Sequence, residues 1–155
     1  LDYDAEARVL ELFGGTGALS LECLSRGAAN ATCLELSPKH ARFIEQNFAA
    51  TRLPQDGFHL RVQDVFTALP QLAAAGAQFD LILADPPFGE KNVGRRSTSL
   101  SQRLLDDDEL PKLLAPDGLF VLGHTKRDTL TLTPAWAEVK EMKHGDSMMT
   151  FLRGK

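Results

Sequence analysis

The sequence predicts an α/β protein built on a doubly wound, mostly parallel sheet of seven strands with a C-terminal antiparallel hairpin. Three observations support this prediction. Short β-prone runs alternate with amphipathic helical stretches along most of the chain, a pattern typical of parallel sheets covered by helices on both faces. A glycine turn, Gly14-Gly15-Thr16-Gly17, joins the first strand to the first helix. Two final β-prone runs flank His144-Gly145-Asp146, which indicates a hairpin.

The expected elements follow the chain in order. They are a strand at 8–13, a helix at 18–25, a strand at 31–36, a helix from 39 to about 50, a strand at 58–63, a helix from 65 to about 75, a strand at 79–84, a helix that ends at 114, and strands at 119–122, 136–143 and 148–153. Apolar runs identify the early strands, and Ala41, Ile44 and Phe48 recur at helical spacing.

Local signals mark several of the boundaries. Ser37-Pro38 predicts a helix start, because serine caps helices and proline suits their first turn. Pro116-Asp117-Gly118 predicts the turn before the fifth strand. The acidic run at 106–109 is interpreted as a solvated helix start, where acids suit the helix dipole.

Composition limits the class of protein. The 155 residues fit one domain, 1–155, and the formal net charge of −4 excludes a surface that is basic all over. Cys23 and Cys33 lack the spacing of a metal or redox motif, so we expect both to be buried and free. No apolar run approaches the ~20 residues of a membrane span, which predicts a soluble, cytoplasmic protein without membrane contact. The four histidines have no nearby metal-ligand partners, and no metal is expected.

Carboxylates stand at or near the ends of the first four strands, where ligands bind in open α/β sheets. They are Glu11, Glu35, Asp64 and Asp85. Glu35 is positioned to accept hydrogen bonds from a ribose. Asp64 suits either an adenine amine, with Val65 and Phe66 against the ring, or the N-cap of the next helix. Glu11 lies in an apolar run and needs a partner, either a ligand ammonium group or a backbone amide of the glycine turn.

The glycine turn allows the backbone to approach a ligand closely, because a Cβ at Gly14, Gly15 or Gly17 would collide with it. The pattern Gly15-x-Gly17-x-x-Ser20 lacks the third glycine of the dinucleotide fingerprint. An ordinary tight turn is the alternative interpretation.

Asp85-Pro86-Pro87-Phe88 is the main candidate for chemistry, because two prolines continue neither a strand nor a helix. The Asp85 carboxylate and the Pro86 carbonyl can accept both protons of an aromatic amine, and Phe88 offers a face on which the base can stack. An electrophilic methyl sulfonium suits the acid-rich edge beside them. The alternative is a rigid turn.

Basic residues follow this tetrapeptide. Lys91, Arg95, Arg96 and Arg103 would stand beside a flipped-out base and contact phosphates. A solvated, mobile loop is the competing interpretation.

The segments Glu11 to Gly17, Glu35, Asp64 and Asp85 to Phe88 resemble motifs of the class I S-adenosylmethionine-dependent methyltransferases. More narrowly, the stretch Leu12 to Ala28, the tetrapeptide and the closing hairpin resemble the RsmD family, which methylates N2 of a guanine in small-subunit (16S) ribosomal RNA. The resemblance covers nearly the whole chain. It implies a Rossmann-like fold, S-adenosylmethionine as cofactor, and ribosomal RNA or the assembling small subunit as partner of a monomer.

Carried over by position, the resemblance implies two groups of site residues. The cofactor contacts are Glu11, Phe13, Gly14, Gly15, Gly17, Glu35 and Asp64, and the base-handling residues are Asp85, Pro86, Pro87 and Phe88. The chain departs from the family at its start, where residues 1–7 replace a basic segment. We therefore expect a methyltransferase domain that lacks this N-terminal segment.

Three alternatives stay open. Within the same chemistry they are methylation of adenine N6 or cytosine N4 in DNA, although no separate target-recognition domain is evident, and methylation of a protein glutamine amide. A non-catalytic module that binds NAD through the glycine turn represents a different class.

Overall fold

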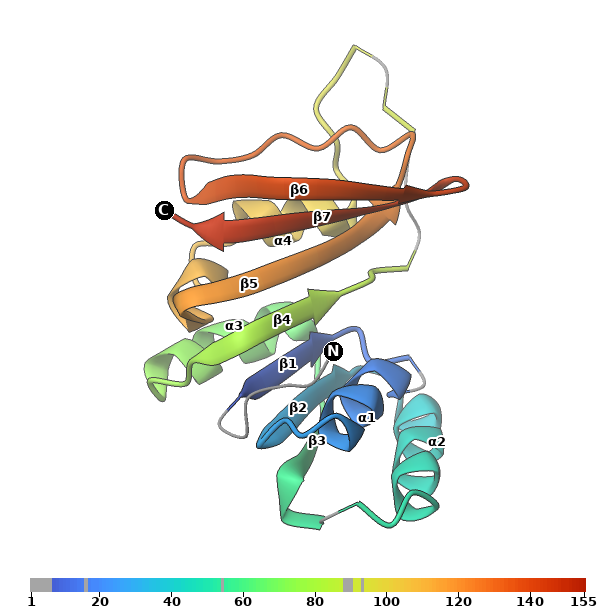
Figure 1. Ribbon diagram of the computed structural model, residues 1–155. Coiled ribbons are helices and arrows are strands. Elements are labelled where there is room, and N and C mark those ends of the chain that lie inside the picture. The colour runs from blue at the N-terminus through green and yellow to red at the C-terminus, as the bar shows by residue number, and fades with distance from the viewer. Residues whose placement is uncertain (1–6, 16, 54, 88–90, 93) are drawn as a thin grey trace.

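The computed structural model describes residues 7–15, 17–53, 55–87, 91–92 and 94–155 (Figure 1). The strands in these ranges are β1 (Arg8–Leu12), β2 (Asn30–Glu35), β3 (Phe58–Val62), β4 (Phe79–Ala84), β5 (Leu114–Thr125), β6 (Trp136–His144) and β7 (Ser147–Gly154). The helices are α1 (Ala18–Ser25), α2 (Pro38–Ala49), α3 (Val65–Ala74) and α4 (Leu100–Asp106), with 3-10 turns η1 (Gln55–Gly57) and η2 (Leu110–Leu113).

Seven strands form one sheet within the described ranges, in the order β3-β2-β1-β4-β5-β7-β6. Strands β1 to β5 pair in parallel, β7 is antiparallel to β5, and β6 is antiparallel to β7. The predicted fold class and the closing hairpin are therefore confirmed. The strand order reverses between β1 and β4, which is where ligands bind in sheets of this kind.

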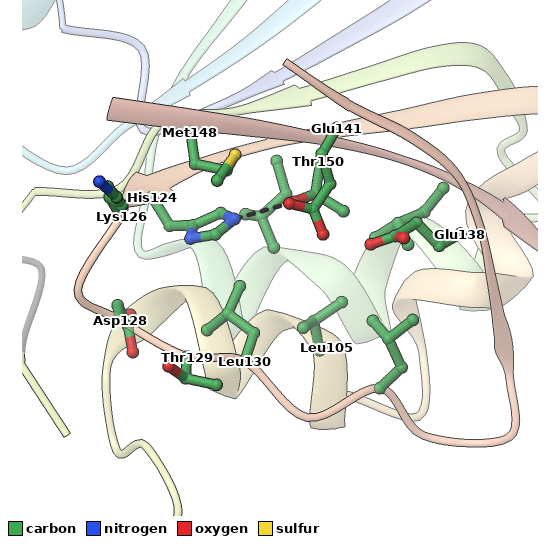
Figure 2. A pocket seen from close by; sticks show the side chains of 13 residues that line it. Leu105, His124, Lys126, Asp128, Thr129, Leu130, Glu138, Glu141, Met148 and Thr150 are labelled. Atoms are coloured by element: carbon green, nitrogen blue, oxygen red, sulfur yellow. Dashed lines mark hydrogen bonds between the residues drawn. The ribbon is translucent and has the colours of Figure 1, made fainter. Parts of the chain in front are cut away.

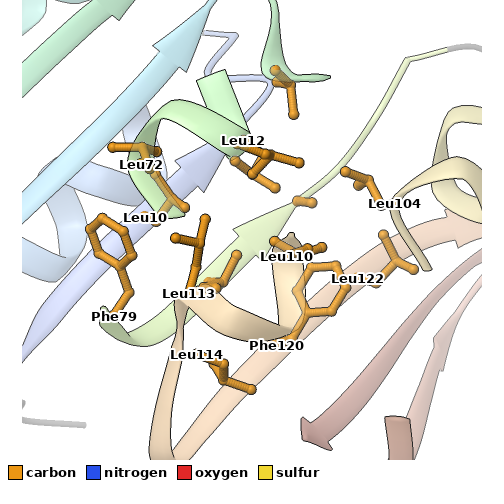
Figure 3. Packing of buried hydrophobic residues seen from close by; sticks show 14 of the residues in the cluster. Leu10, Leu12, Leu72, Phe79, Leu104, Leu110, Leu113, Leu114, Phe120 and Leu122 are labelled. Carbon is orange, nitrogen blue, oxygen red and sulfur yellow. The ribbon is translucent and has the colours of Figure 1, made fainter. Parts of the chain in front are cut away.

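Helices cover the two faces of the sheet, with α1 and α2 on one face and α3 and α4 on the other (Figure 1). The larger hydrophobic cluster lies on the α3 and α4 side (Figure 3). Its fully buried members include Leu10, Leu12, Ile82, Leu104 and Phe120. Cys23 and Cys33 are buried, as predicted, and neither forms a disulfide. Among the described residues, none of the helices has the length and apolar character needed to cross a bilayer.

Three helices begin as short-range chemistry dictates. The side chains of Ser37, Asp64 and Ser99 each accept a hydrogen bond from a backbone N–H in the first turn of α2, α3 and α4, respectively. Pro38 occupies the first turn of α2, as predicted. The prediction of a cap at Ser37 is thus confirmed, and the N-cap alternative for Asp64 is correct.

The prediction of a helix that ends at Leu114 is wrong. Helix α4 ends at Asp106, because Asp107 is extended (φ −72°, ψ 128°). Its Oδ1 accepts hydrogen bonds from the backbone N–H groups of Glu109 (2.8 Å) and Leu110 (3.0 Å), which opens η2 instead. Strand β5 then starts at 114 rather than 119 and incorporates the expected turn. The acids at 106–109 consequently lie between the end of α4 and the start of η2, whose N-cap is Glu109, and not at the start of the long helix that the sequence predicted.

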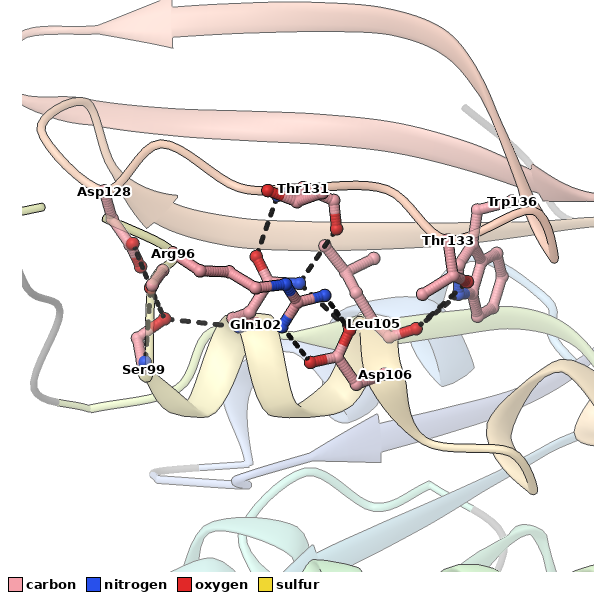
Figure 4. Close-up of polar contacts among 10 residues, drawn as sticks. Arg96, Ser99, Gln102, Leu105, Asp106, Asp128, Thr131, Thr133 and Trp136 are labelled. Atoms are coloured by element: carbon pink, nitrogen blue, oxygen red, sulfur yellow. Dashed lines mark hydrogen bonds and ion pairs between the residues drawn. The ribbon is translucent and has the colours of Figure 1, made fainter. Parts of the chain in front are cut away.

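Two side-chain amides hold the segment that links β5 to β6, residues 126–135, which we call the strap. Asn92 Nδ2 donates to the carbonyl of Thr129 (3.0 Å), and Asn92 Oδ1 accepts from the Thr129 N–H (2.8 Å). Gln102 forms the same pair of bonds with Thr131, each 2.8 Å long (Figure 4). Each amide therefore reproduces the pairing of a neighbouring strand at alternate strap residues.

Further contacts complete the seam between α4 and the strap (Figure 4). Ser97 Oγ donates to Asp128 Oδ1 (2.5 Å), and Trp136 Nε1 donates to the Leu105 carbonyl (3.1 Å). Both Asp128 and Trp136 are almost completely buried. The segment that follows the Asp85 tetrapeptide is thus joined to the strap at several points.

We predict that Gln102→Ala lowers the free energy of unfolding by about 1–3 kcal/mol, because it removes two hydrogen bonds made by a buried amide. Urea denaturation measures the change. Gln63→Ala is the matched control, because its bond to Gln71 is exposed, and we expect it to cost less than about 0.5 kcal/mol. Equal losses in the two variants would contradict the structural role of the Gln102 pair.

Candidate active site

The register of the central strands brings the predicted site residues to one edge of the sheet. Leu12 of β1 is paired with Leu34 of β2 on one side and with Ala84 of β4 on the other. The residues that follow these three positions therefore lie at the same edge. They are Phe13, Glu35 and Asp85.

A cavity of about 620 Å³ opens at this edge. Among its lining residues are nine that the sequence analysis named for the site, namely Phe13, Gly15, Glu35, Asp64, Val65, Phe66, Asp85, Pro87 and Arg103. Five more were not named as site residues, namely Leu34, Leu36, Ser37, His40 and Leu100. Three of the four strand-end carboxylates thus meet at one cavity, as the fold rule for open α/β sheets predicts.

Glu35 connects the two loops that border the cavity. Its Oε1 accepts a hydrogen bond from the backbone N–H of Gly15 (2.9 Å), and its Oε2 accepts one from the N–H of Ser37 (2.7 Å). The residue is 8% exposed, and His40 Nδ1 lies 3.9 Å from Oε2. The carboxylate is therefore held in one orientation before any ligand arrives, with lone pairs left for further donors.

Glu11 does not line the cavity, and its role as a cofactor contact stays a prediction. It is 4% exposed, and its Oε1 accepts hydrogen bonds from Ser20 Oγ (2.6 Å) and the Ser20 N–H (3.1 Å). Burial raises the pKa of the Glu11 carboxyl above its ordinary value of 4.5, although the bonds from Ser20 oppose the shift. The sequence analysis expected Glu11 to pair with a ligand or with the glycine turn, but its partner is Ser20 in the first turn of α1. No sequence signal linked Glu11 to Ser20.

Packing inside the protein requires glycine at positions 14 and 17. A Cβ on Gly14 would overlap Cys33 Sγ of β2, and a Cβ on Gly17 would lie 2.8 Å from Ile44 Cγ2 of α2. Neither glycine lines the cavity. Gly15 does line it, and its φ of 59° is the left-handed conformation that glycine adopts without strain. Packing is thus a sufficient reason for glycine at 14 and 17, and the close approach of a ligand to these two positions stays a prediction.

Phe13 also has a positive φ, 60°, which is costly for a residue with a side chain. Its ring meets that of Phe66 edge-on, with the centroids 6.4 Å apart. Arg103 lies over the Phe66 ring, with its guanidinium carbon 3.8 Å from the ring centre. The strained backbone, the two rings and the guanidinium form one wall of the cavity.

Asp64 stands beside this wall. Its Oδ2 caps α3 by accepting from the Thr67 N–H (3.1 Å) and the Thr67 hydroxyl (3.2 Å). The same carboxylate lines the cavity, so the two roles that the sequence left open are compatible.

Two residues of the Asp85 tetrapeptide line the cavity. Asp85 and Pro87 are exposed and line it, whereas Pro86 is half-buried and does not. Phe88 lies outside the described residues, so its predicted stacking role remains a prediction.

The predicted nucleic-acid residues separate into two groups. Lys91 and Arg95 are exposed on the segment after the tetrapeptide. Arg96 instead forms a bidentate ion pair with Asp106 (2.6 and 2.7 Å), and Arg103 lies over Phe66 at the cavity. Arg96 and Arg103 are thus engaged by Asp106 and Phe66, and the phosphate contacts of the four residues stay a prediction.

A family model described as "Conserved hypothetical protein 95" matches residues 2–153. The chain belongs to this family. This chain is 35% identical over 117 residues to a ribosomal RNA large subunit methyltransferase of Deinococcus radiodurans. The match covers 74% of this chain and 28% of that protein. The chain thus spans less than a third of that relative's length.

Several solved structures have the same fold as this chain. The candidate methyltransferase yhhF of Escherichia coli superposes with a TM-score of 0.75 at 25% identity, over 97% of this chain and 78% of that one. SMU.776, a candidate methyltransferase complexed with SAH, superposes with a TM-score of 0.74 at 18% identity, over 96% of this chain and 46% of that one. The fold is that of the class I methyltransferases.

A second cavity, of about 200 Å³, lies between the hairpin and the strap (Figure 2). His124 Nε2 lies 2.8 Å from Thr150 Oγ1 in its wall, which also carries Glu138 and Glu141. Within the part of the chain that the structure describes, no three His, Cys, Asp or Glu side chains are placed to hold a metal ion.

We predict that Gly14→Ala lowers the free energy of unfolding by about 1–3 kcal/mol, because the new methyl group overlaps Cys33 Sγ. In a Cys33→Ala background, which removes Sγ, the same substitution should cost less than about 1 kcal/mol. A double-mutant cycle in urea measures this coupling. A stable Gly14→Ala variant that loses cofactor binding would instead favour the ligand role.

We predict that the ion pair of Asp106 depends on pH. The bonds from Arg96 hold the pKa of the Asp106 carboxyl below its ordinary value of 3.8, so its contribution to stability is complete above that value and is lost as the pH falls through the folded-state pKa. The difference in free energy of unfolding between the native chain and Asp106→Asn should therefore shrink below pH 3.8. A constant difference between pH 7 and about pH 2 would contradict the pairing.

Proposed function

We propose that the chain is an S-adenosylmethionine-dependent methyltransferase that modifies the exocyclic N2 amine of a guanine in small-subunit ribosomal RNA. One observation carries the proposal. Asp85, the acceptor at the head of the tetrapeptide, lines the same cavity as Glu35 and Asp64. An amine acceptor is thereby adjacent to an acid-lined cofactor cavity.

The residues of the cavity fit this cofactor. Its volume, about 620 Å³, lies within the range of small-molecule sites. Glu35 has lone pairs for the ribose hydroxyls, Asp64 can accept from the adenine amine, and Val65 and Phe66 offer apolar contact to the purine. When bound, S-adenosylmethionine supplies an electrophilic methyl group on a sulfonium. The acids also favour that positive charge.

The chain's own residues prepare the amine for attack. The Asp85 carboxylate accepts a hydrogen bond from one N–H of the guanine amine, and the Pro86 carbonyl accepts the other. These bonds release the nitrogen lone pair from the ring and direct it at the electrophile. Asp85 can then take the proton that the nitrogen loses. Positioning and charge are sufficient, so the protein needs no nucleophile of its own.

The acidic cavity favours this cofactor over NAD. A pyrophosphate needs backbone N–H groups and a helix N-terminus free of competing charge. Here Ser20 occupies the position of the third glycine in the dinucleotide fingerprint, and it donates to the buried Glu11 carboxylate. The cavity itself is lined by the carboxylates of Glu35, Asp64 and Asp85, which would repel a pyrophosphate.

Ribosomal RNA is the proposed substrate, with phosphate contacts from Lys91 and Arg95. The likeness to the RsmD family motifs supports the small-subunit target. The name of the Deinococcus radiodurans relative supports a large-subunit target as the second candidate. Either substrate implies that the reaction takes place in the cytoplasm.

We predict that Asp85→Ala reduces methyl transfer at least 100-fold while the affinity for S-adenosylmethionine stays within about threefold, because an acceptor for the amine is lost and the cofactor contacts are retained. Transfer of tritiated methyl groups to transcripts of both ribosomal RNAs measures activity and separates the two targets. Calorimetry measures binding of S-adenosylmethionine and of NAD.

Asp108→Ala is the matched control, because this aspartate is exposed and does not line the cavity, and we expect full activity. Full activity of Asp85→Ala would contradict the mechanism. Tight binding of NAD without binding of S-adenosylmethionine would overturn the proposed function.

A further inference from the structure

Gly123 of β5 lies beside the candidate catalytic carboxylate. Its neighbour Leu122 is paired with Ala84, so Gly123 is level with the residue that follows β4, which is Asp85. A Cβ on Gly123 would lie 2.7 Å from Asp85 Oδ1, 3.2 Å from Asp85 Cγ and 3.5 Å from the Ala84 carbonyl oxygen. The Asp85 side chain therefore occupies the space that a side chain at 123 would need.

The backbone gives no other reason for a glycine here. Gly123 has no left-handed φ, in contrast to Gly15 and Gly17, so its backbone is accessible to any residue. Glycine inside a strand weakens that strand, because it loses more backbone entropy and packs no side chain. A strand glycine without a special φ indicates the close approach of another group, and Asp85 is that group.

The backbone of Gly123 is held by α4 and β7. Ser101 Oγ of α4 donates to the Gly123 carbonyl oxygen (3.3 Å), and β7 pairs with Gly123 through Met149. The backbone at this position is therefore fixed by two neighbours. A Cβ added at 123 cannot be accommodated by a shift of β5 without disturbing both contacts.

The Asp85 carboxylate is the part that can move. It is exposed, and the atoms nearest the added Cβ belong to the end of its flexible side chain. Cβ contacts below 3.0 Å are essentially never observed, and those up to 3.4 Å are tight, so Oδ1 must retreat by about 0.3–0.7 Å. The substitution should displace the carboxylate and leave the fold intact.

We propose that Gly123 is a positioning residue for methyl transfer, which sets the place of the Asp85 carboxylate by leaving room for it against β5. This inference rests on the proposed function, in which Asp85 accepts the amine proton. It gives a specific reason for a glycine that lies 38 residues after Asp85 in the chain. Reaction rates are sensitive to displacements of this size, since a misplacement of about 1 Å can cost on the order of 100-fold.

The test compares Gly123→Ala with Gly154→Ala, in which the same methyl group is added in β7, where nothing lies within 4 Å. We expect kcat of Gly123→Ala to fall about tenfold, with KM and Kd for S-adenosylmethionine and the thermal midpoint nearly unchanged. Gly154→Ala should match the native chain. A second readout independent of turnover is the ¹³C resonance of the Asp85 carboxyl carbon, identified by its loss in Asp85→Asn.

The outcomes separate the two ideas. A moved Asp85 resonance together with a reduced kcat supports the positioning role. An unmoved resonance, or a moved resonance with native kcat, overturns it while the proposed function stands. Loss of cofactor affinity in proportion to kcat also overturns it, because the effect would then be a general one. If the native chain methylates neither ribosomal RNA, the proposed function fails and the catalytic role of Gly123 fails with it, while the resonance still reports whether the contact exists.

Discussion

The shared register of β2, β1 and β4 is the constraint on which the rest of the site depends. Leu12 pairs with both Leu34 and Ala84, so the three strands end level at the point where the strand order reverses. Parallel strands carry their carboxyl ends to the same edge, and chain segments far apart in the sequence thereby place Phe13, Glu35 and Asp85 around one cavity. A slip of one residue in any of these strands would turn the side chains to the other face of the sheet.

The acids at this edge differ in what they do because they differ in burial and partners. Glu11 is committed to Ser20 and to the packing of α1 against β1. Glu35 is nearly as buried but bonds to two backbone N–H groups that belong to the cavity's own loops, so it orients the loops and lines the cavity. Asp85 is exposed and is limited by the space beside Gly123. The free-energy cost of placing a charged group at such a site is low only where hydrogen-bond donors or solvent compensate for its desolvation.

The other half of the sheet supports the segment that follows the tetrapeptide. Asn92 and Gln102 give the strap the hydrogen bonds of a neighbouring strand, and Ser97 reaches the buried Asp128. The same short helix, α4, carries Gln102 toward the strap and Arg103 toward Phe66. The cofactor cavity and the strap are therefore joined through adjacent residues of one helix.

The amino-acid sequence by itself determined the fold class, the hairpin, the helix cap at Ser37 and which strand ends carry acids, because periodicity, turn residues and capping are local and leave a direct trace in the residue order. It also singled out most of the polar residues of the cavity. Only the tertiary structure decided how those residues are used. It assigned Gly14 and Gly17 to packing against Cys33 and Ile44, and Glu11 to Ser20. It also assigned Arg96 to Asp106 and Gly123 to Asp85. These pairings depend on distances between elements that are separate in the sequence, and close packing in three dimensions sets such distances.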